Sequence, residues 1–327
     1  MEIEELDQGL GVYVWLTATN QRGESPPSNA NFYSAGAVND LDGDGRSDIL
    51  WRHDSGLLVA FLMNGTSINH TGLMWAGNDR SVVGTPDLDG DGRADIVWRG
   101  LDGLVSAWLM DGTDVIADAQ ISTLPLDWTI IATPDLDGDG RGDILLRHAT
   151  GYLGAWFMDG TAITSFGGIG LFGTAWTFAA APDLDADGRD DLLFQHTNGT
   201  LHAWLMDGAT IVSEGAIFTL PGGWQVSGAP DLNGDGHSDL LFGFDSGDFF
   251  AFFMNGLAIA GWSLAPGPGP GWVVQGFPDL NGDNRGDILW RHVDGSVHAW
   301  FMDGMQILDQ GPIVTVGTDW TILDVMR

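Results

Sequence analysis

The chain has 327 residues, with 45 Asp or Glu, 12 Arg, no Lys and no Cys, and its formal net charge is −33. So negative a protein repels phosphate backbones and anionic surfaces, which argues against binding nucleic acid through a basic patch. The absence of Cys excludes a disulfide scaffold, a thiolate metal site and a Cys nucleophile, and 15 Trp with 16 Phe exclude a solvated acidic tail.

The first residues, Met1-Glu2-Ile3-Glu4-Glu5, lack the basic and apolar regions of a secretory signal. If the protein is exported, we expect this chain to be a processed or excised piece. No apolar run approaches the ~20 residues of a membrane span, so we predict no membrane insertion.

An acidic nine-residue segment then recurs six times, beginning at Asp40, Asp87, Asp135, Asp183, Asp231 and Asp279, with spacings of 47, 48, 48, 48 and 48 residues. Its pattern is Asp-x-(Asp/Asn)-x-Asp-Gly-x-x-Asp, with Asn284 in place of the Gly in the last copy. A fixed period of this length is typical of repeat architectures and must be explained before any single motif.

The rest of the unit repeats as well. A short apolar run follows each acidic segment, as in Ile49-Leu50-Trp51, and then come a Gly turn and a second run such as Ala299-Trp300-Phe301-Met302-Asp303-Gly304. A third run follows, and the unit ends in a Trp-led run at Trp128, Trp176, Trp224, Trp272 and Trp320. Short β-rich runs bounded by Gly, Asp and Pro predict four strands per unit. We therefore predict an all-β fold, a β-propeller of four-stranded blades.

The number of blades depends on residues 1–31. The Trp-led run at Trp320 has no acidic segment after it, and Gly11–Leu16 aligns with Ser296–Phe301. On this basis we predict seven blades, the last made of outer strands from residues 1–31 and an inner strand from the C-terminus. The alternative is six blades over residues 32–327, because residues 16–29 also resemble the final strands of a fibronectin type III module, whose remnant would then precede the propeller.

The acidic segments have the chemistry of calcium loops. Acids at positions 1, 3 and 5 can turn their oxygens inward around a tight curl that the Gly at position 6 permits. A backbone carbonyl at position 7 and the Asp at position 9 complete six or seven oxygen ligands, which suit Ca²⁺ better than Mg²⁺. We predict about six structural calcium ions. The predicted ligand residues are Asp40, Asp42, Asp44, Arg46 and Asp48; Asp87, Asp89, Asp91, Arg93 and Asp95; Asp135, Asp137, Asp139, Arg141 and Asp143; Asp183, Asp185, Asp187, Arg189 and Asp191; Asp231, Asn233, Asp235, His237 and Asp239; and Asp279, Asn281, Asp283, Arg285 and Asp287.

These loops explain much of the charge. Of the 45 acids, 22 lie at loop positions 1, 3, 5 and 9, four in each of four loops and three in each of the other two. Six bound Ca²⁺ would bring the formal charge from −33 to −21.

The loops and the 48-residue unit, with Trp51-Arg52-His53 and the Ala299–Gly304 run, resemble bacterial FG-GAP/VCBS-type repeats, and the loops look like those of integrin α subunits. The resemblance covers residues 32 to 327. It implies a calcium-binding β-propeller, usually seven-bladed, in a secreted or cell-surface protein that serves adhesion, ligand or glycan binding, or accompanies an enzyme domain. Ala186 and Asn284 depart from the pattern by replacing Gly. Asn233 and Asn281 keep an oxygen ligand but remove a charge, so we expect weaker sites in the last two loops.

One set of repeated side chains could bind a ligand. Near the end of the first run, an Arg follows four of the six loops and a His follows four, and with nearby aromatic rings they could form a sugar pocket or could simply brace the turn. These candidates are Trp51, Arg52, His53, Arg147, His148, His196, Arg291 and His292. The Trp residues at 48-residue spacing are expected between blades, whereas Trp75 and Trp262 lie outside that register and are expected to be exposed.

We find no catalytic triad, dyad or phosphate loop among the residues that break the repeat. The sequence therefore favours a non-enzymatic binding or adhesion module with glycans or a protein receptor as partners. The alternatives are a polysaccharide lyase or hydrolase, or its accessory domain, and a structural or assembly subunit, since the oligomeric state is not indicated.

Overall fold

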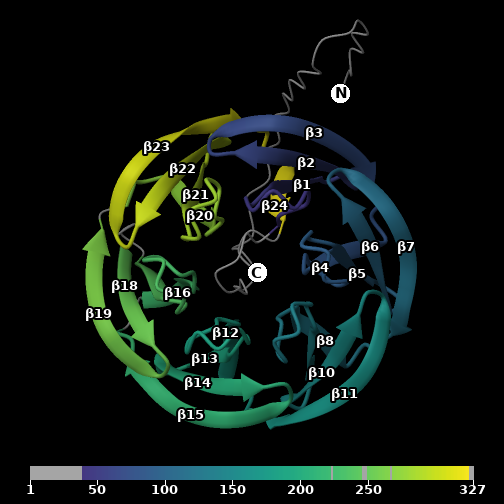
Figure 1. The fold of residues 1–327 in the computed structure, drawn as a ribbon, viewed down its shortest axis with the longest axis vertical. Coiled ribbons are helices and arrows are strands. Elements are labelled where there is room, and N and C mark those ends of the chain that lie inside the picture. The colour runs from purple at the N-terminus through teal and green to yellow at the C-terminus, as the bar shows by residue number, and fades with distance from the viewer. Residues whose placement is uncertain (1–38, 222–223, 245–248, 266, 324–327) are drawn as a thin grey trace, which may run out of the picture.

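A computed structural model describes residues 39–221, 224–244, 249–265 and 267–323 as six four-stranded antiparallel sheets arranged around a central axis (Figure 1). We call these sheets blades 1 to 6 and list their strands from the axis outward. Blade 1 contains β24 (Trp320–Leu323), β1 (Ile49–His53), β2 (Leu57–Asn64) and β3 (Ser67–Trp75); blade 2 contains β4 (Arg80–Gly84), β5 (Ile96–Gly100), β6 (Leu104–Asp111) and β7 (Asp114–Thr123); blade 3 contains β8 (Trp128–Ala132), β9 (Ile144–His148), β10 (Tyr152–Asp159) and β11 (Ala162–Leu171). Blade 4 contains β12 (Trp176–Ala180), β13 (Leu192–His196), β14 (Thr200–Asp207) and β15 (Thr210–Thr219); blade 5 contains β16 (Trp224–Gly228), β17 (Leu240–Phe244), β18 (Phe249–Asn255) and β19 (Ala258–Ala265); blade 6 contains β20 (Trp272–Gly276), β21 (Ile288–His292), β22 (Ser296–Asp303) and β23 (Gln306–Thr315).

The all-β propeller prediction is confirmed, but the prediction of seven blades is wrong. The C-terminal strand β24 pairs with β1 in antiparallel register, from Leu50 opposite Leu323 to His53 opposite Trp320. It is therefore the innermost strand of blade 1 and is not part of a seventh blade. The structural unit begins with the Trp-led strand, not with the acidic loop, so six inner strands and six loops make six blades. The predicted outer strands in residues 1–31 lie outside the described residues.

The blades pack face to face through the apolar side chains that the repeat places on alternate positions. The second strand of each blade is buried over its first three residues, and Trp51, Trp98 and Trp290 on these strands are at most 2% exposed. The inner-strand residues Trp176 and Trp272 each pack against one of the buried apolar clusters. The outer strands alternate between partly buried and exposed residues, so the propeller presents one long edge strand per blade at its rim.

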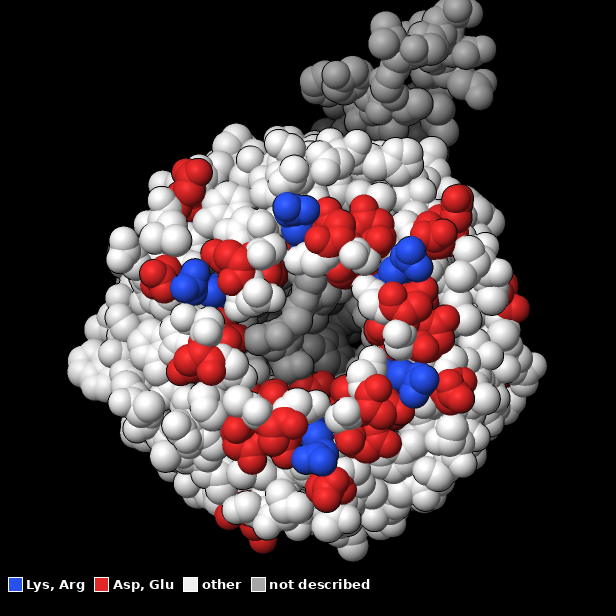
Figure 2. All heavy atoms as spheres, viewed as in Figure 1, with Lys and Arg blue, Asp and Glu red and all other residues white. Residues whose placement is uncertain are grey.

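Within the described residues, no helix is long and apolar enough to cross a membrane. The six acidic loops all lie at the same end of the ring, because each one leads into the second strand of its blade. Figure 2 shows this end, where acidic side chains surround the central opening and Arg side chains alternate with them.

Candidate metal centres

The Asp at loop position 1 shapes the loop. In loop 1, Oδ1 of Asp40 accepts hydrogen bonds from the backbone N–H groups of Gly43 (2.8 Å) and Asp44 (3.1 Å), and Oδ2 accepts one from Gly45 (2.8 Å). Gly45 has φ of +81°, the left-handed conformation that glycine adopts without strain. Position-1 carboxylates in the other loops accept from the same positions, for example from Gly234 and Gly236 in loop 5. The curl predicted from the sequence therefore forms around the side chain of its first residue.

The Asp at position 9 ties the loop to the blade. Asp48 is 1% exposed, and its Oδ2 accepts from the N–H of Leu41 (2.9 Å) while its Oδ1 accepts from the N–H of Met63 on β2 (2.8 Å). The same pair of bonds occurs in all six loops, as with Met158 and Leu136 around Asp143. These bonds fix the carboxylate in place before any cation arrives.

Burial disfavours the ionised form of these six position-9 carboxyl groups when no cation is near. Removal from water is the largest cause of the shift at every position 9, and it outweighs the two backbone hydrogen bonds. The pKa is raised to about 8 at Asp48, Asp143, Asp191 and Asp287, and to about 7 at Asp95 and Asp239. A nearby cation would favour the ionised form.

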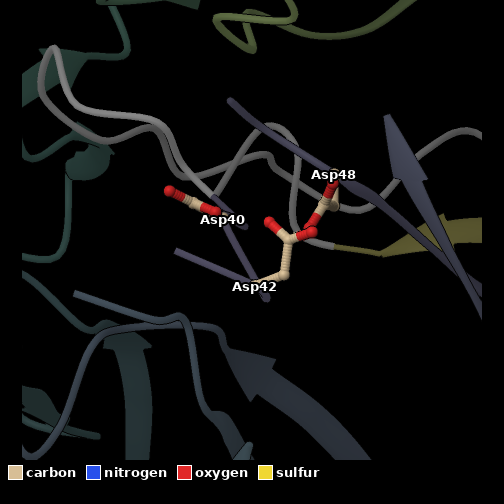
Figure 3. Close-up of side chains that lie close together, drawn as sticks. All are labelled: Asp40, Asp42 and Asp48. Atoms are coloured by element: carbon tan, nitrogen blue, oxygen red, sulfur yellow. The ribbon is translucent and has the colours of Figure 1, made fainter. Parts of the chain in front are cut away.

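Three carboxylates converge in each of the first four loops. At positions 1, 3 and 9 of these loops, one oxygen atom per residue lies within 4.8 Å of the other two. Figure 3 shows this convergence for Asp40, Asp42 and Asp48 in loop 1. Loops 5 and 6 keep the Asp at positions 1 and 9 but carry Asn233 and Asn281 at position 3, and their amide nitrogens donate to the position-5 carboxylates.

The predicted ligands at positions 5 and 7 behave differently from the converging set. Asp44 at position 5 accepts the backbone N–H of Arg46 (3.0 Å) and pairs with its guanidinium (2.8 Å). The same pairing occurs in loops 2, 3, 4 and 6. Positions 1, 3 and 9 are therefore the core of the candidate site, while ligation by the position-5 carboxylates and the position-7 carbonyls stays a prediction.

The residues present fit a hard divalent cation. Every donor is oxygen, which Ca²⁺ and Mg²⁺ prefer over transition metals. In loop 4, Oδ1 of Asp185 is buried and has no hydrogen-bond partner in the structure, although it lies in the cluster with Asp183 and Asp191. A buried carboxylate oxygen without a partner is costly, and a cation at the centre of the cluster would satisfy it.

The loops also join neighbouring blades, a role that their spacing did not predict. The N–H of Ala94 in loop 2 donates to the carbonyl of Asp40 in loop 1 (2.6 Å), and the N–H of Gly112 in the blade 2 hairpin donates to that of Leu41 (2.8 Å). Equivalent pairs occur at every seam, including the closing seam, where Ser47 donates to Asp279 (2.7 Å). A signal was present, because the hairpin Gly recurs with the same period as the loops.

Arg side chains at position 7 add to the seams. Arg141 Nε donates to the carbonyl of Asp89 in the preceding loop (3.3 Å) and lies 3.6 Å from the hairpin carboxylate of Asp159. His237 takes this place in loop 5 and contacts the carbonyl of Leu184 (2.9 Å). Each candidate centre is thus bounded by its own blade and by the next one.

The predicted ligand-binding side chains lie at the opposite end of the blades. Trp51 is 1% exposed, so its ring offers no face to a sugar. The Arg residues brace the blade seams: Arg52 donates to the carbonyls of Gly77 and Arg80 (2.8 Å each), Arg147 donates to that of Trp176 (2.9 Å), and Arg291 donates to that of Trp320 (2.7 Å). A sugar-binding role for this set stays a prediction.

The four predicted His residues pack on the Trp rings of their inner strands, with ring centroids 4.7–5.0 Å apart for His53, His148, His196 and His292. His53 also contacts Ser55 Oγ through Nδ1 (2.6 Å) and Asp319 Oδ2 through Nε2 (2.8 Å). This order matches that of a nucleophile, base and acid. However, Nδ1 also accepts the backbone N–H of Ser55 (3.0 Å), as expected for a side chain that braces its own turn.

The fold and the repeated loops define a β-propeller built from a single repeated unit. Two stretches of the chain, residues 87–146 and 183–242, match the sequence profile of the FG-GAP-like repeat. The chain is therefore a β-propeller that contains FG-GAP-like repeats, and propellers of this kind are typically non-catalytic binding modules. No curated protein sequence matches the chain significantly.

Solved structures are similar to this chain at low sequence identity. A lectin of Agrocybe aegerita, described as recognising non-reducing terminal N-acetylglucosamine, is 17% identical with a TM-score of 0.56, over 85% of this chain and 79% of the lectin. BBS1N in complex with ARL6DN is 12% identical with a TM-score of 0.48, over 87% of this chain and 82% of that one. Raptor of Chaetomium thermophilum is 13% identical with a TM-score of 0.47, over 82% of this chain and 22% of that one.

Proposed function

We propose that the protein is a calcium-stabilised, non-catalytic binding or adhesion module of a secreted or cell-surface protein. The observation that carries this proposal is the convergence of three carboxylates at positions 1, 3 and 9 in loops that also join adjacent blades. Such a site links cation binding directly to the closure of the ring.

The chain's own residues would hold the ion in a defined way. Position-1 and position-9 carboxylates are already oriented by backbone N–H groups, so little ordering remains when the ion binds. Calcium would supply the positive charge that lets the converging carboxylates stay ionised while buried. Because the position-1 carbonyl accepts a bond from the next blade, fixing the loop also fixes the seam.

The test is a melting curve in calcium and in chelator. Extracellular calcium modules bind with dissociation constants of roughly 10⁻⁴ to 10⁻³ M. At ten times the dissociation constant, each site adds ~1.4 kcal/mol to the free energy of unfolding, so six sites would add ~8 kcal/mol. We expect a large increase in Tm with calcium and a smaller one with magnesium. An unchanged midpoint would contradict the proposal.

Carbohydrate is the ligand class that we propose to test first. Support comes from the fold shared with a lectin and from the polar His and Arg side chains that recur at the end of the blades away from the loops. A glycan array in calcium is expected to show binding, and a blank array would count against this part of the proposal. Turnover of acidic polysaccharides would instead favour the lyase or hydrolase alternative.

A further inference from the structure

The outer edges of the blades are not equally protected against pairing with another strand. Natural edge strands avoid such pairing with charges, bulges and short lengths. The edges of blades 2, 4 and 6 carry acidic residues, Asp114 and Asp118 on β7, Glu214 on β15 and Asp309 on β23. The uncharged edge β11 pairs with β10 through two register shifts, whereas β3 and β19 have a single shift each and no charged residue.

Of these two less protected edges, β19 is the more apolar. Trp262 is 65% exposed and Leu264 is 59% exposed, and the ring of Trp262 lies 5.7 Å from that of Phe250 on β18. Across the seam with blade 4, Phe218 is 41% exposed and contacts Phe252 at a centroid distance of 5.0 Å. These side chains form one apolar surface at the seam of blades 4 and 5.

The repeat itself shows that this surface is a local departure. The position of Trp262 is occupied by Asp118, Phe166, Glu214 and Gln310 in blades 2, 3, 4 and 6. On β3 the exposed Leu73 and Trp75 share the strand with the polar residues Ser67, Asn69 and His70, so that edge is only partly apolar.

We propose that β19 pairs edge to edge with β19 of a second copy of this chain. In an antiparallel pair centred on Ser263, Trp262 of each copy lies opposite Leu264 of the other. Cross-strand pairs of an aromatic and an aliphatic side chain stabilise sheets, and the contact is isologous, as closed dimers require.

Charge selects the edge at which two copies of the chain can meet. Two molecules with a net charge of −33 repel each other, and the acidic edges β7, β15 and β23 add like charges at close range. An uncharged edge is where two copies can approach with the least repulsion. A sugar is a poorer fit, because a sugar site needs polar groups beside its aromatic ring, and Trp262 is flanked by Phe250, Phe252 and Leu264.

The first experiment is sedimentation of the whole chain in calcium over a range of concentrations. We expect the mass to rise from 34.9 kDa toward twice that value. Trp262→Glu should remain monomeric, whereas Phe166→Glu, at the equivalent position of the doubly bulged β11, should dimerise like the unmodified chain. A monomeric unmodified chain, or equal dimerisation of the two variants, would overturn the proposal. A calcium-dependent melting transition in each variant shows that it is folded.

A cross-linking experiment tests the register. The chain has no Cys, so Ser263→Cys introduces its single thiol. Directly opposed residues of an antiparallel pair have Cα atoms about 4.5–5.5 Å apart, within the range of a disulfide. We expect rapid disulfide dimers from Ser263→Cys and slow ones from Ser165→Cys on β11. Equal yields from the two variants would overturn the pairing of β19 about Ser263.

Discussion

The acidic-loop end of the propeller keeps the repeat closely, whereas the outer rim does not. At the loop end, the two bonds of the position-9 Asp and the seam bonds recur in all six blades with nearly the same distances, from Asp48 to Asp287. At the rim, one position holds Asp118, Phe166, Glu214, Trp262 and Gln310 in five successive blades. The loop end is uniform because every blade must close against the next one in the same way.

The rim has no such requirement, so its sequence is free to diverge. An edge strand contacts only one neighbour within its sheet, and its exposed face can change without breaking a seam. Repetition within this chain therefore marks the groups that hold the ring together, while departures from the repeat mark the surfaces on which blades differ.

The largest effect is expected from pH in the absence of metal. The pKa of the position-9 carboxyls is raised in the folded state to about 7 or 8 from 3.8 in the unfolded chain. The unfolded state therefore releases these protons at lower pH than the folded state, and stability falls as pH rises from about 4 to about 8. Each group contributes at most about 1.4 kcal/mol per pH unit. In chelator, calorimetry should show a lower Tm at pH 8 than at pH 5.

Calcium provides the control for this experiment. A bound cation keeps the carboxylates ionised in the folded state, so the difference between their folded and unfolded pKa values shrinks. We expect a weaker dependence of Tm on pH in calcium, and a gap between the calcium and chelator curves that widens as pH rises. A chelated protein that becomes more stable between pH 5 and pH 8 would refute the assignment of these buried carboxyls.

The next effect separates position 9 from position 5. Asp143→Ala leaves the buried N–H groups of Leu136 and Met158 without their acceptor, at a cost of about 1–3 kcal/mol each. Asp139→Ala loses an exposed pair with Arg141, worth less than about 1 kcal/mol. Urea unfolding in chelator should therefore show that Asp143→Ala, but not Asp139→Ala, lowers the free energy of unfolding by about 3 kcal/mol. In calcium, Asp143→Ala should lower it by about 1.4 kcal/mol more, because one cation site is lost. Equal losses in the two variants would contradict the comparison.

Much of the fold and of the site was predictable because the signals are repeated. The acidic spacing located the loops, and the Trp-led runs located the inner strands. Trp75 and Trp262 lie outside the 48-residue spacing of the other Trp residues, and we therefore predict that they are exposed. Their side chains are exposed, at 67% and 65%. Six copies of one pattern average out the local ambiguity that limits a single motif.

Closure of the ring was not predictable in the same way. A period gives the repeating unit but not the point at which the unit begins, so the partner of Trp320 could be residues 1–31 or β1. The count of inner strands would have settled the question, but Arg80 stands where the other inner strands begin with Trp. The pairing of the position-5 Asp with Arg was also hidden, because spacing does not reveal which way a side chain turns.

The smallest effect is expected at loop position 4, where one of the six loops has Ala in place of Gly. Ala186 has φ of +59° at loop position 4, where loops 1, 2, 3, 5 and 6 have Gly. A left-handed conformation costs a residue with a Cβ atom roughly 1–2 kcal/mol, offset in part by the greater freedom of Gly in the unfolded chain. We expect Ala186→Gly to raise the free energy of unfolding by about 0.5–1 kcal/mol. The matched reverse change, Gly90→Ala at φ of +76°, should lower it by a similar amount. If both variants shift in the same direction, the cost at position 4 belongs to packing against the neighbouring Arg rather than to the backbone of the loop.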